Sequence, residues 1–86
     1  MNNVLAFAGV VLDQYSGLPI AGAEVQITYD GSVTFTNANG TFYLGTTLPD
    51  NWYEDYLQIS AFGHVTVGNY YYGYGFISRL QIYLSP

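Results

Sequence analysis

Residues 7–27, FAGVVLDQYSGLPIAGAEVQI, decide the fold of this 86-residue chain. Apolar residues alternate at both ends of the stretch with the period of two that is typical of β-strands. Between the ends lie turn formers, because Gly allows positive φ, Pro sets φ to about −65°, and Asp and Ser bond to nearby amides. The alternating residues are Phe7, Gly9, Val11, Val25 and Ile27, and the turn formers are Asp13, Ser16, Gly17, Pro19 and Gly22. The stretch therefore predicts a strand, a turn and a second strand, and it carries no chemistry of its own.

The rest of the chain predicts more short strands separated by turns. Turn signals recur roughly every 8–12 residues, and no segment has a helical period. We expect strands at 4–12, 23–29, 33–36, 41–44 and 57–62, a sixth that starts at 65–67, and a last strand at 79–84. Residues 45–55 have no clear strand period, and residues 69–75 are a Tyr/Gly tract of low complexity. We expect an all-β fold in one domain, residues 1–86: a single antiparallel, immunoglobulin-like or prealbumin-like β-sandwich of about seven strands.

The charge balance excludes several classes of partner. Arg79 is the one basic residue against six acidic ones, which gives a formal net charge of −5. No basic patch can form, so we expect neither nucleic-acid binding nor attraction to anionic membranes. Only 8% of the residues are charged, against about a quarter in ordinary soluble domains. A surface made mainly of Tyr, Thr, Asn, Ser, Gln and Gly suits burial in an assembly or contact with neutral, hydroxyl-rich ligands such as glycans.

The chain shows no disulfide framework and no targeting segment. It has no cysteine, and half of its residues are apolar, which is enough for a core without covalent cross-links. The N-terminus lacks the cationic region of a signal peptide, and no apolar run reaches the ~20 residues that span a bilayer. We therefore expect no membrane insertion. The chain could be cytosolic, carried on a virus particle or cut from a longer exported protein, and we favour a virion surface or an extracellular assembly.

Residues 7–27 resemble the opening of carboxypeptidase regulatory-like domains, which are β-sandwiches of the prealbumin (transthyretin) type related to collagen-adhesin B-type repeats. The likeness continues through Thr36, Ala38, Gly40, Phe42 and Leu44, then through Leu57, Ile59, Ser60, Ala61, Gly63 and His64, and finally through Leu80, Ile82, Leu84 and Pro86. It covers nearly the whole chain. The resemblance implies a non-catalytic accessory domain that folds, spaces, stiffens or binds. The fold-signature turn residues that it implies are Asp13, Gly17, Pro19, Gly22, Gly40 and Gly63.

The chain departs from this family at two places. Asp55 stands where the family often has Tyr, and the Tyr/Gly tract replaces a segment that is ordinarily polar. Collagen-adhesin relatives can carry isopeptide bonds, which need a lysine. This chain has no lysine, so we expect no such bond.

The polar residues do not form a recognisable catalytic or metal-binding motif. His64 is the only histidine, and no G-x-S-x-G sequence or further zinc ligand accompanies it, so we expect it to pack at the end of the sandwich. Asp50, Glu54 and Asp55 could offer oxygen atoms to calcium, but their spacing is not that of a calcium loop. We expect Asp13 to bond to amides of its own turn. The prediction is therefore no catalytic residue, no cofactor and no metal site.

An aromatic set exceeds what the core needs. Consecutive strand residues point to opposite sides, so the rings of the tract at 70–76 cannot all face inward. Tyrosine buries a large area and keeps a hydrogen-bonding tip, which favours it at interfaces. The candidate interaction surface consists of Trp52, Tyr53, Tyr70, Tyr71, Tyr72, Tyr74 and Phe76. The alternative is a Tyr-rich loop folded back over its own core.

These features predict a non-enzymatic structural module that associates with itself or with other structural subunits. Examples are a virion decoration, cement or fibre protein and a surface filament. Aromatic and sheet-edge contacts would hold the subunits together, since no lysine protects the sheet edges. The alternative is a carbohydrate- or protein-binding accessory domain of a larger secreted or outer-membrane protein, with Trp52 and the tract as its platform.

Overall fold

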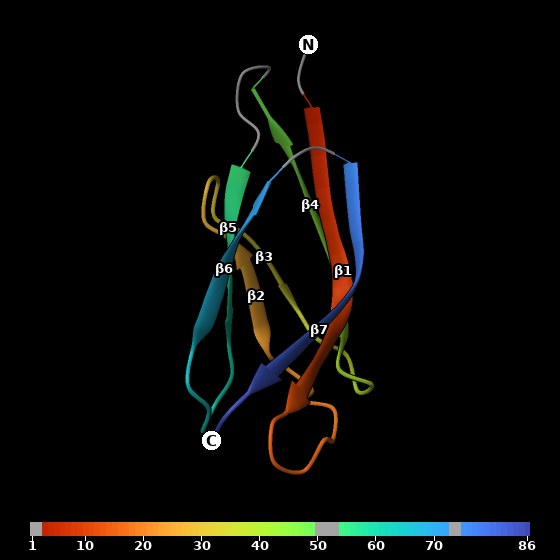
Figure 1. The fold of residues 1–86 in the computed structure, drawn as a ribbon, viewed down its shortest axis with the longest axis vertical. Helices are drawn as coiled ribbons and strands as arrows, with labels where there is room; N and C mark the ends of the chain where they lie inside the picture. The colour runs from red at the N-terminus through yellow and green to blue at the C-terminus, as the bar shows by residue number, and fades with distance from the viewer. Residues whose placement is uncertain (1–2, 50–53, 73–74) are drawn as a thin grey trace.

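The computed structural model describes residues 3–49, 54–72 and 75–86, and every regular element among them is a β-strand (Figure 1). The strands are β1 (Asn3–Asp13), β2 (Glu24–Ile27), β3 (Ser32–Phe35), β4 (Thr41–Leu48), β5 (Glu54–Ser60), β6 (Val67–Tyr72) and β7 (Gly75–Leu84). Over the same residues, no helix is long and apolar enough to cross a membrane.

The strands form two sheets that face each other across one core. The first has three strands in the order β4-β1-β7, and the second has four in the order β3-β2-β5-β6 (Figure 1). All of the strand pairs are antiparallel except β1 and β7, which run side by side in the same direction. The three-stranded sheet is therefore mixed, and the prediction of a wholly antiparallel fold is wrong at this pair. The chain passes from β6 in the second sheet to β7 in the first. Strand β7 then joins β1 at the edge that β4 leaves free.

Residues from both sheets fill the core. Phe7 on β1 is the largest of the fully buried side chains. The other buried apolar residues packed with it are Leu5, Val11, Ala23, Val25, Ile27, Phe42, Leu44, Leu48, Leu57, Ile59, Ile82 and Leu84. Along β4 and β5 these residues recur at every second position, as expected where one face of a strand is buried.

Several predicted boundaries differ from the observed ones. Strand β5 starts at Glu54 and β7 at Gly75, earlier than the predicted 57 and 79. Strand β4 continues to Leu48, although the sequence predicts a loop from residue 45. Residues 45–48 pair with residues 3–6 of the long strand β1, and Leu48 continues the inward series on β4. Strand β6 includes residues 69–72, so the first part of the Tyr/Gly tract is a regular strand paired with β5.

The turn after β1 has the chemistry that its residues predict. One oxygen of Asp13, Oδ1, accepts hydrogen bonds from the amides of Tyr15 (2.9 Å) and Ser16 (2.8 Å). The chain then returns so that Pro19 bridges to β1. Gly40, in the next turn but one, has a φ of 75°, and a Cβ there would lie 2.7 Å from a backbone oxygen of β1. This end of the sandwich therefore depends on a small set of turn residues.

The β1–β7 ladder contains a bulge. Its register shifts between Phe7 and Gly9, and one extra residue on β7 leaves Arg79 with a φ of 60°. Gly9 is required beside the bulge, because a Cβ at this position would lie 2.7 Å from the Cβ of Leu80 and still closer to its carbonyl oxygen. The only lysine or arginine of the chain thus sits in a backbone conformation that most side chains avoid.

Candidate interaction surface

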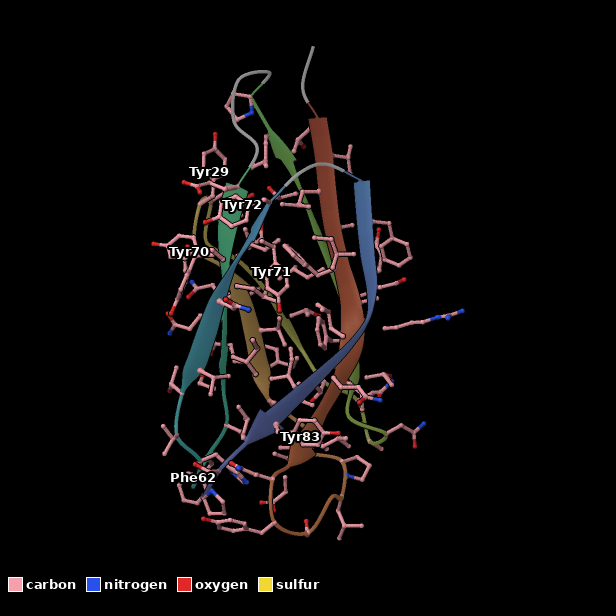
Figure 2. The ribbon with its side chains drawn as sticks, in the orientation of Figure 1. Tyr29, Phe62, Tyr70, Tyr71, Tyr72 and Tyr83 are labelled. Atoms are coloured by element: carbon pink, nitrogen blue, oxygen red, sulfur yellow. The ribbon has the colours of Figure 1, made fainter. Side chains whose placement is uncertain are left out.

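The structure divides the predicted aromatic set among different faces. Tyr70 and Tyr72 on β6 point outward and are 56% and 64% exposed. Figure 2 labels both and shows Tyr70 on the outer side of the four-stranded sheet. We call the outer face of β3-β2-β5-β6 the tyrosine face. Trp52, Tyr53 and Tyr74 lie outside the described residues.

Tyr71 does not belong to the exposed surface that the sequence predicts. Its side chain points between the sheets (Figure 2), and its ring meets that of Phe7 edge-on, with 5.2 Å between centroids and an angle of 63°. The alternation of strand residues places it there, because both of its neighbours point outward. Tyr71 is thus a core residue at the sandwich margin.

Phe76 is exposed, but on the opposite side of the molecule. It lies on β7 with its ring 5.9 Å from that of Tyr43 on β4. These two rings belong to the outer face of β4-β1-β7, which we call the β1 face. The candidate surface is therefore two surfaces, one on each sheet.

Tyr56 is a member of the tyrosine face that sequence reasoning missed. It lies opposite Tyr70 on the neighbouring strand, and the two rings meet edge-on at 4.9 Å. Its ring also lies over Gly68, since a Cβ built on that glycine would overlap the phenol group. A ring that covers a glycine of the adjacent strand is held flat against the sheet. Only the β5–β6 register reveals this, so no local sequence signal could have found it.

The rest of the tyrosine face mixes amides, apolar groups and carboxylates. Register places Gln26 beside both Gln58 and Val33, in the middle of the sheet. Glu24 and Glu54 point outward toward opposite ends of the face, next to Phe35 and Tyr72 respectively. Both carboxylates of this face are therefore near exposed aromatic rings.

The β1 face is apolar along its centre. The residues of β1 that alternate with the core residues are all apolar: Val4, Ala6, Ala8, Val10 and Leu12. Val4 is exposed, Ala6 is buried and the other three are half-buried. The sequence predicts β1 to be central or covered on both sides. The structure places it at the centre of its sheet, but no further layer among the described residues covers this face.

A shallow hollow interrupts the β1 face next to the bulge. Its volume is about 510 Å³, and it is lined by residues that include Ala8, Val10, Thr41, Arg79 and Gln81. The small side chains of β1 form its floor, and Arg79 from β7 lies at its side. The hollow therefore offers an apolar base beside the guanidinium-bearing Arg79.

His64 and Asp13 form an ion pair at the end of the sandwich. The histidine Nε2 lies 2.9 Å from Asp13 Oδ2, and its Nδ1 lies 2.9 Å from the carbonyl oxygen of Phe62. Both oxygens are acceptors, so both hydrogen bonds form together only when both ring nitrogens carry a proton. The pKa of His64 is raised, first by the bond to Phe62 and then by Asp13. The pKa of Asp13 is lowered to about 2, first by the Ser16 amide and then by His64.

This pair predicts a stability that depends on pH. Because its pKa is raised on folding, protonated His64 adds to the free energy of unfolding. This contribution is fully present below pH 6.5, the ordinary pKa of histidine, and is lost as pH rises through the folded-state pKa. Ionised Asp13 likewise adds to the free energy of unfolding. Its contribution is fully present above pH 3.8, the ordinary pKa of aspartate, and is lost as pH falls through about 2. We expect the melting temperature of the native protein to exceed that of His64→Gln at about pH 6. The difference should shrink toward about pH 9. Thermal unfolding followed by circular dichroism checks this, and a constant difference over the range would contradict it.

The acidic residues that the sequence analysis weighed as calcium ligands do not share a face where the structure describes them. Glu54 and Asp55 are consecutive residues of β5 and point to opposite sides, while Asp50 lies outside the described residues. Over the described part of the chain, no three acidic or histidine side chains gather as metal ligands.

Asp55 is buried instead. Its Oδ1 accepts bonds from the amides of Tyr56 (2.7 Å) and Tyr29 (3.2 Å), and its Oδ2 has no partner among the described residues. Burial, aided by the charge of Asp30, raises its pKa although both amides oppose the shift.

Comparison with known proteins supports the fold. No protein-family model matches the chain, and no curated protein matches it. The chain is similar in structure to 3-chlorocatechol 1,2-dioxygenase from Rhodococcus opacus 1CP, with a TM-score of 0.71 and 14% sequence identity. The match covers 99% of this chain, which spans 60% of the length of the dioxygenase chain. At this identity the likeness concerns the fold alone, because unrelated functions share folds.

Proposed function

We propose that the protein is a non-enzymatic structural module that associates with copies of itself. The observation that carries this proposal is the outward exposure of aromatic rings on both sheets: Tyr70 and Tyr72 on one, Tyr43 and Phe76 on the other. Aromatic side chains are enriched at protein interfaces and scarce on surfaces that stay in water. Virion decoration, cement and fibre proteins and surface filaments are the classes of assembly that fit such a module.

The edge of the four-stranded sheet adds support. Strand β6 is the last strand of that sheet and contains neither lysine nor proline. Such residues are common devices against edge-to-edge pairing, as are bulges. By contrast, β7 at the edge of the other sheet carries both a bulge and Arg79. Self-association through β6 is thus less hindered than association through β7.

The chemistry of His64 favours a role without catalysis. A general base needs a free lone pair on a ring nitrogen. Both ring nitrogens of His64 instead lie 2.9 Å from oxygen atoms. Asp13, its partner, is held ionised by its turn, since the Ser16 amide and His64 lower its pKa to about 2. While His64 is protonated, the pair therefore stabilises the end of the sandwich and leaves neither ring nitrogen with a free lone pair.

We further propose that the two-sheet fold is of the prealbumin type and that the chain is a carboxypeptidase regulatory-like domain. The turn after β1 supports this proposal, because its Asp, Gly and Pro residues form the hydrogen bonds and bridge described above.

Replacing Tyr70 and Tyr72 together by serine should weaken self-association at least about tenfold, because two large exposed rings are lost from the edge strand β6. Size-exclusion chromatography with light scattering, over a range of protein concentrations, measures the change. Tyr15→Ser is the matched control, since Tyr15 is 80% exposed on the turn at the end of the molecule. Unchanged association of the double variant would contradict the role of the tyrosine face, and a strictly monomeric native protein would contradict self-association.

The flat ring of Tyr56 favours glycan binding as a second candidate function. An aromatic ring that lies along a sheet can stack on a sugar ring. Gln26 and Gln58 occupy neighbouring register positions, and their side-chain amides can form hydrogen bonds with the hydroxyl groups of that sugar. Retention of the native protein on neutral polysaccharides in affinity electrophoresis would support this function. Equal migration of the native protein and Tyr56→Ser in every gel would exclude it.

A further inference from the structure

The two outer faces of the sandwich differ in charge. The outward residues of the β1 face include no carboxylate, and the hollow on it is lined by Arg79, the only lysine or arginine of the chain. The tyrosine face carries Glu24 and Glu54, while His64, the one other basic side chain, is paired with Asp13 at the end of the sandwich. The faces are therefore of opposite sign on opposite sides of one molecule.

The faces also differ in shape. The β1 face contains the hollow of about 510 Å³ above Ala8 and Val10. On the tyrosine face, Tyr70 and Tyr72 project from β6 as exposed rings. A tyrosine ring placed in the hollow would cover apolar side chains and lie next to the Arg79 guanidinium, and cations attract aromatic rings.

We propose that these faces bind each other in different copies of the chain, so that the β1 face of one copy receives the tyrosine face of the next. This inference rests on the proposed self-association and specifies its geometry. Contact between two unlike faces is heterologous. It leaves one face of each kind free at the ends, so it forms open rows rather than closed pairs unless rotation closes a ring.

The size of the faces sets the expected strength. Three strands about 4.8 Å apart and eight residues long at about 3.3 Å each give a face of roughly 14 Å by 26 Å. One junction then buries roughly 800 Å² in total, about half of a standard interface. A single junction should be weak, and every inner copy of a row is held by two. Because every added copy forms one identical junction, assembly should increase gradually with concentration and decrease with salt.

A charge exchange tests the geometry. The first variant is Arg79→Asp, chosen because Asp tolerates positive φ better than most residues. The second is Glu24→Arg with Glu54→Arg, because either carboxylate could meet Arg79. Arg79→Asn is the control that removes the charge and keeps the backbone conformation. Circular dichroism checks that each variant folds, and single changes at Glu24 or Glu54 replace the double variant if it unfolds.

In the proposed geometry, each charge variant alone should assemble at least about tenfold more weakly than the native protein, because like charges meet at every junction. An equimolar mixture should regain native assembly within about threefold, since both kinds of junction then join opposite charges. Light scattering at low salt measures all of these states.

Other outcomes overturn the inference. If β1 faces met each other, the Glu24→Arg/Glu54→Arg variant would assemble like the native protein. If tyrosine faces met each other, Arg79→Asp would do so. Failure of the mixture to recover would exclude the unlike-face junction as well. A native protein that stays monomeric under all conditions would instead overturn the proposed function, so the two failures are distinguishable.

Discussion

Phe7→Ala should lower the free energy of unfolding by about 3–5 kcal/mol. Phe7 is fully buried and is the largest side chain of the core, so its removal leaves a cavity between the two sheets. The edge-on contact with Tyr71 is lost as well. A domain of 86 residues has a total stability of roughly 4–13 kcal/mol. The substitution therefore removes a large share of it.

Urea unfolding followed by circular dichroism measures this loss. Phe62→Ala is the matched control, because Phe62 is fully exposed in the turn after β5. It should change the unfolding free energy by less than about 0.5 kcal/mol. A small effect of Phe7→Ala, comparable with that of Phe62→Ala, would show that the sheets do not close over Phe7 as described.

Gly9→Val should lower the free energy of unfolding by a similar amount, about 3 kcal/mol or more. The new Cβ would meet the backbone oxygen and the Cβ of Leu80 on β7. Backbone held in a ladder cannot move aside as a flexible side chain can, so the β1–β7 pairing must distort at the bulge. Amide hydrogen exchange should show this as faster exchange in β7 than in β5.

Gly45→Ala is the control for this prediction. Its Cβ would lie 3.4 Å from that of Ala6, which is an ordinary contact, and its φ is not positive. Alanine at such a site stabilises by about 0.4–1 kcal/mol, because it restricts the unfolded chain. Equal effects of Gly9→Val and Gly45→Ala would refute the close approach of β1 and β7.

Much of the fold follows from local sequence. The alternation of Val25 and Ile27 and the turn chemistry of Asp13 act within a few residues, so their strand and turn are predictable. The parallel pairing of β1 and β7 is not, because no local signal states which strand a distant one joins. The extent of β4 also depends on its partner: Gly45 and the threonines after it form a strand because β1 is long enough to pair with them.

The candidate surface was predictable in kind but not in place. Alternation explains why Tyr70 and Tyr72 point outward and Tyr71 inward, once β6 is known to be a strand. It cannot place Phe76 on the opposite sheet, since that depends on the crossing between β6 and β7. The pairing of His64 with Asp13 joins residues 51 positions apart and has no sequence signature.

The parallel pair also has a consequence for biosynthesis. Strand β1 lies between β4 and β7, and roughly 60 residues separate the end of β1 from the start of β7. At about 5–20 residues per second, a ribosome needs roughly 3–12 s to supply the missing partner. Both edges of β1 are unpaired until β4 (Thr41–Leu48) is made, and one edge stays unpaired until β7 follows. An unpaired edge is a template for pairing with other chains, so β1 is the strand most exposed to misassociation during synthesis.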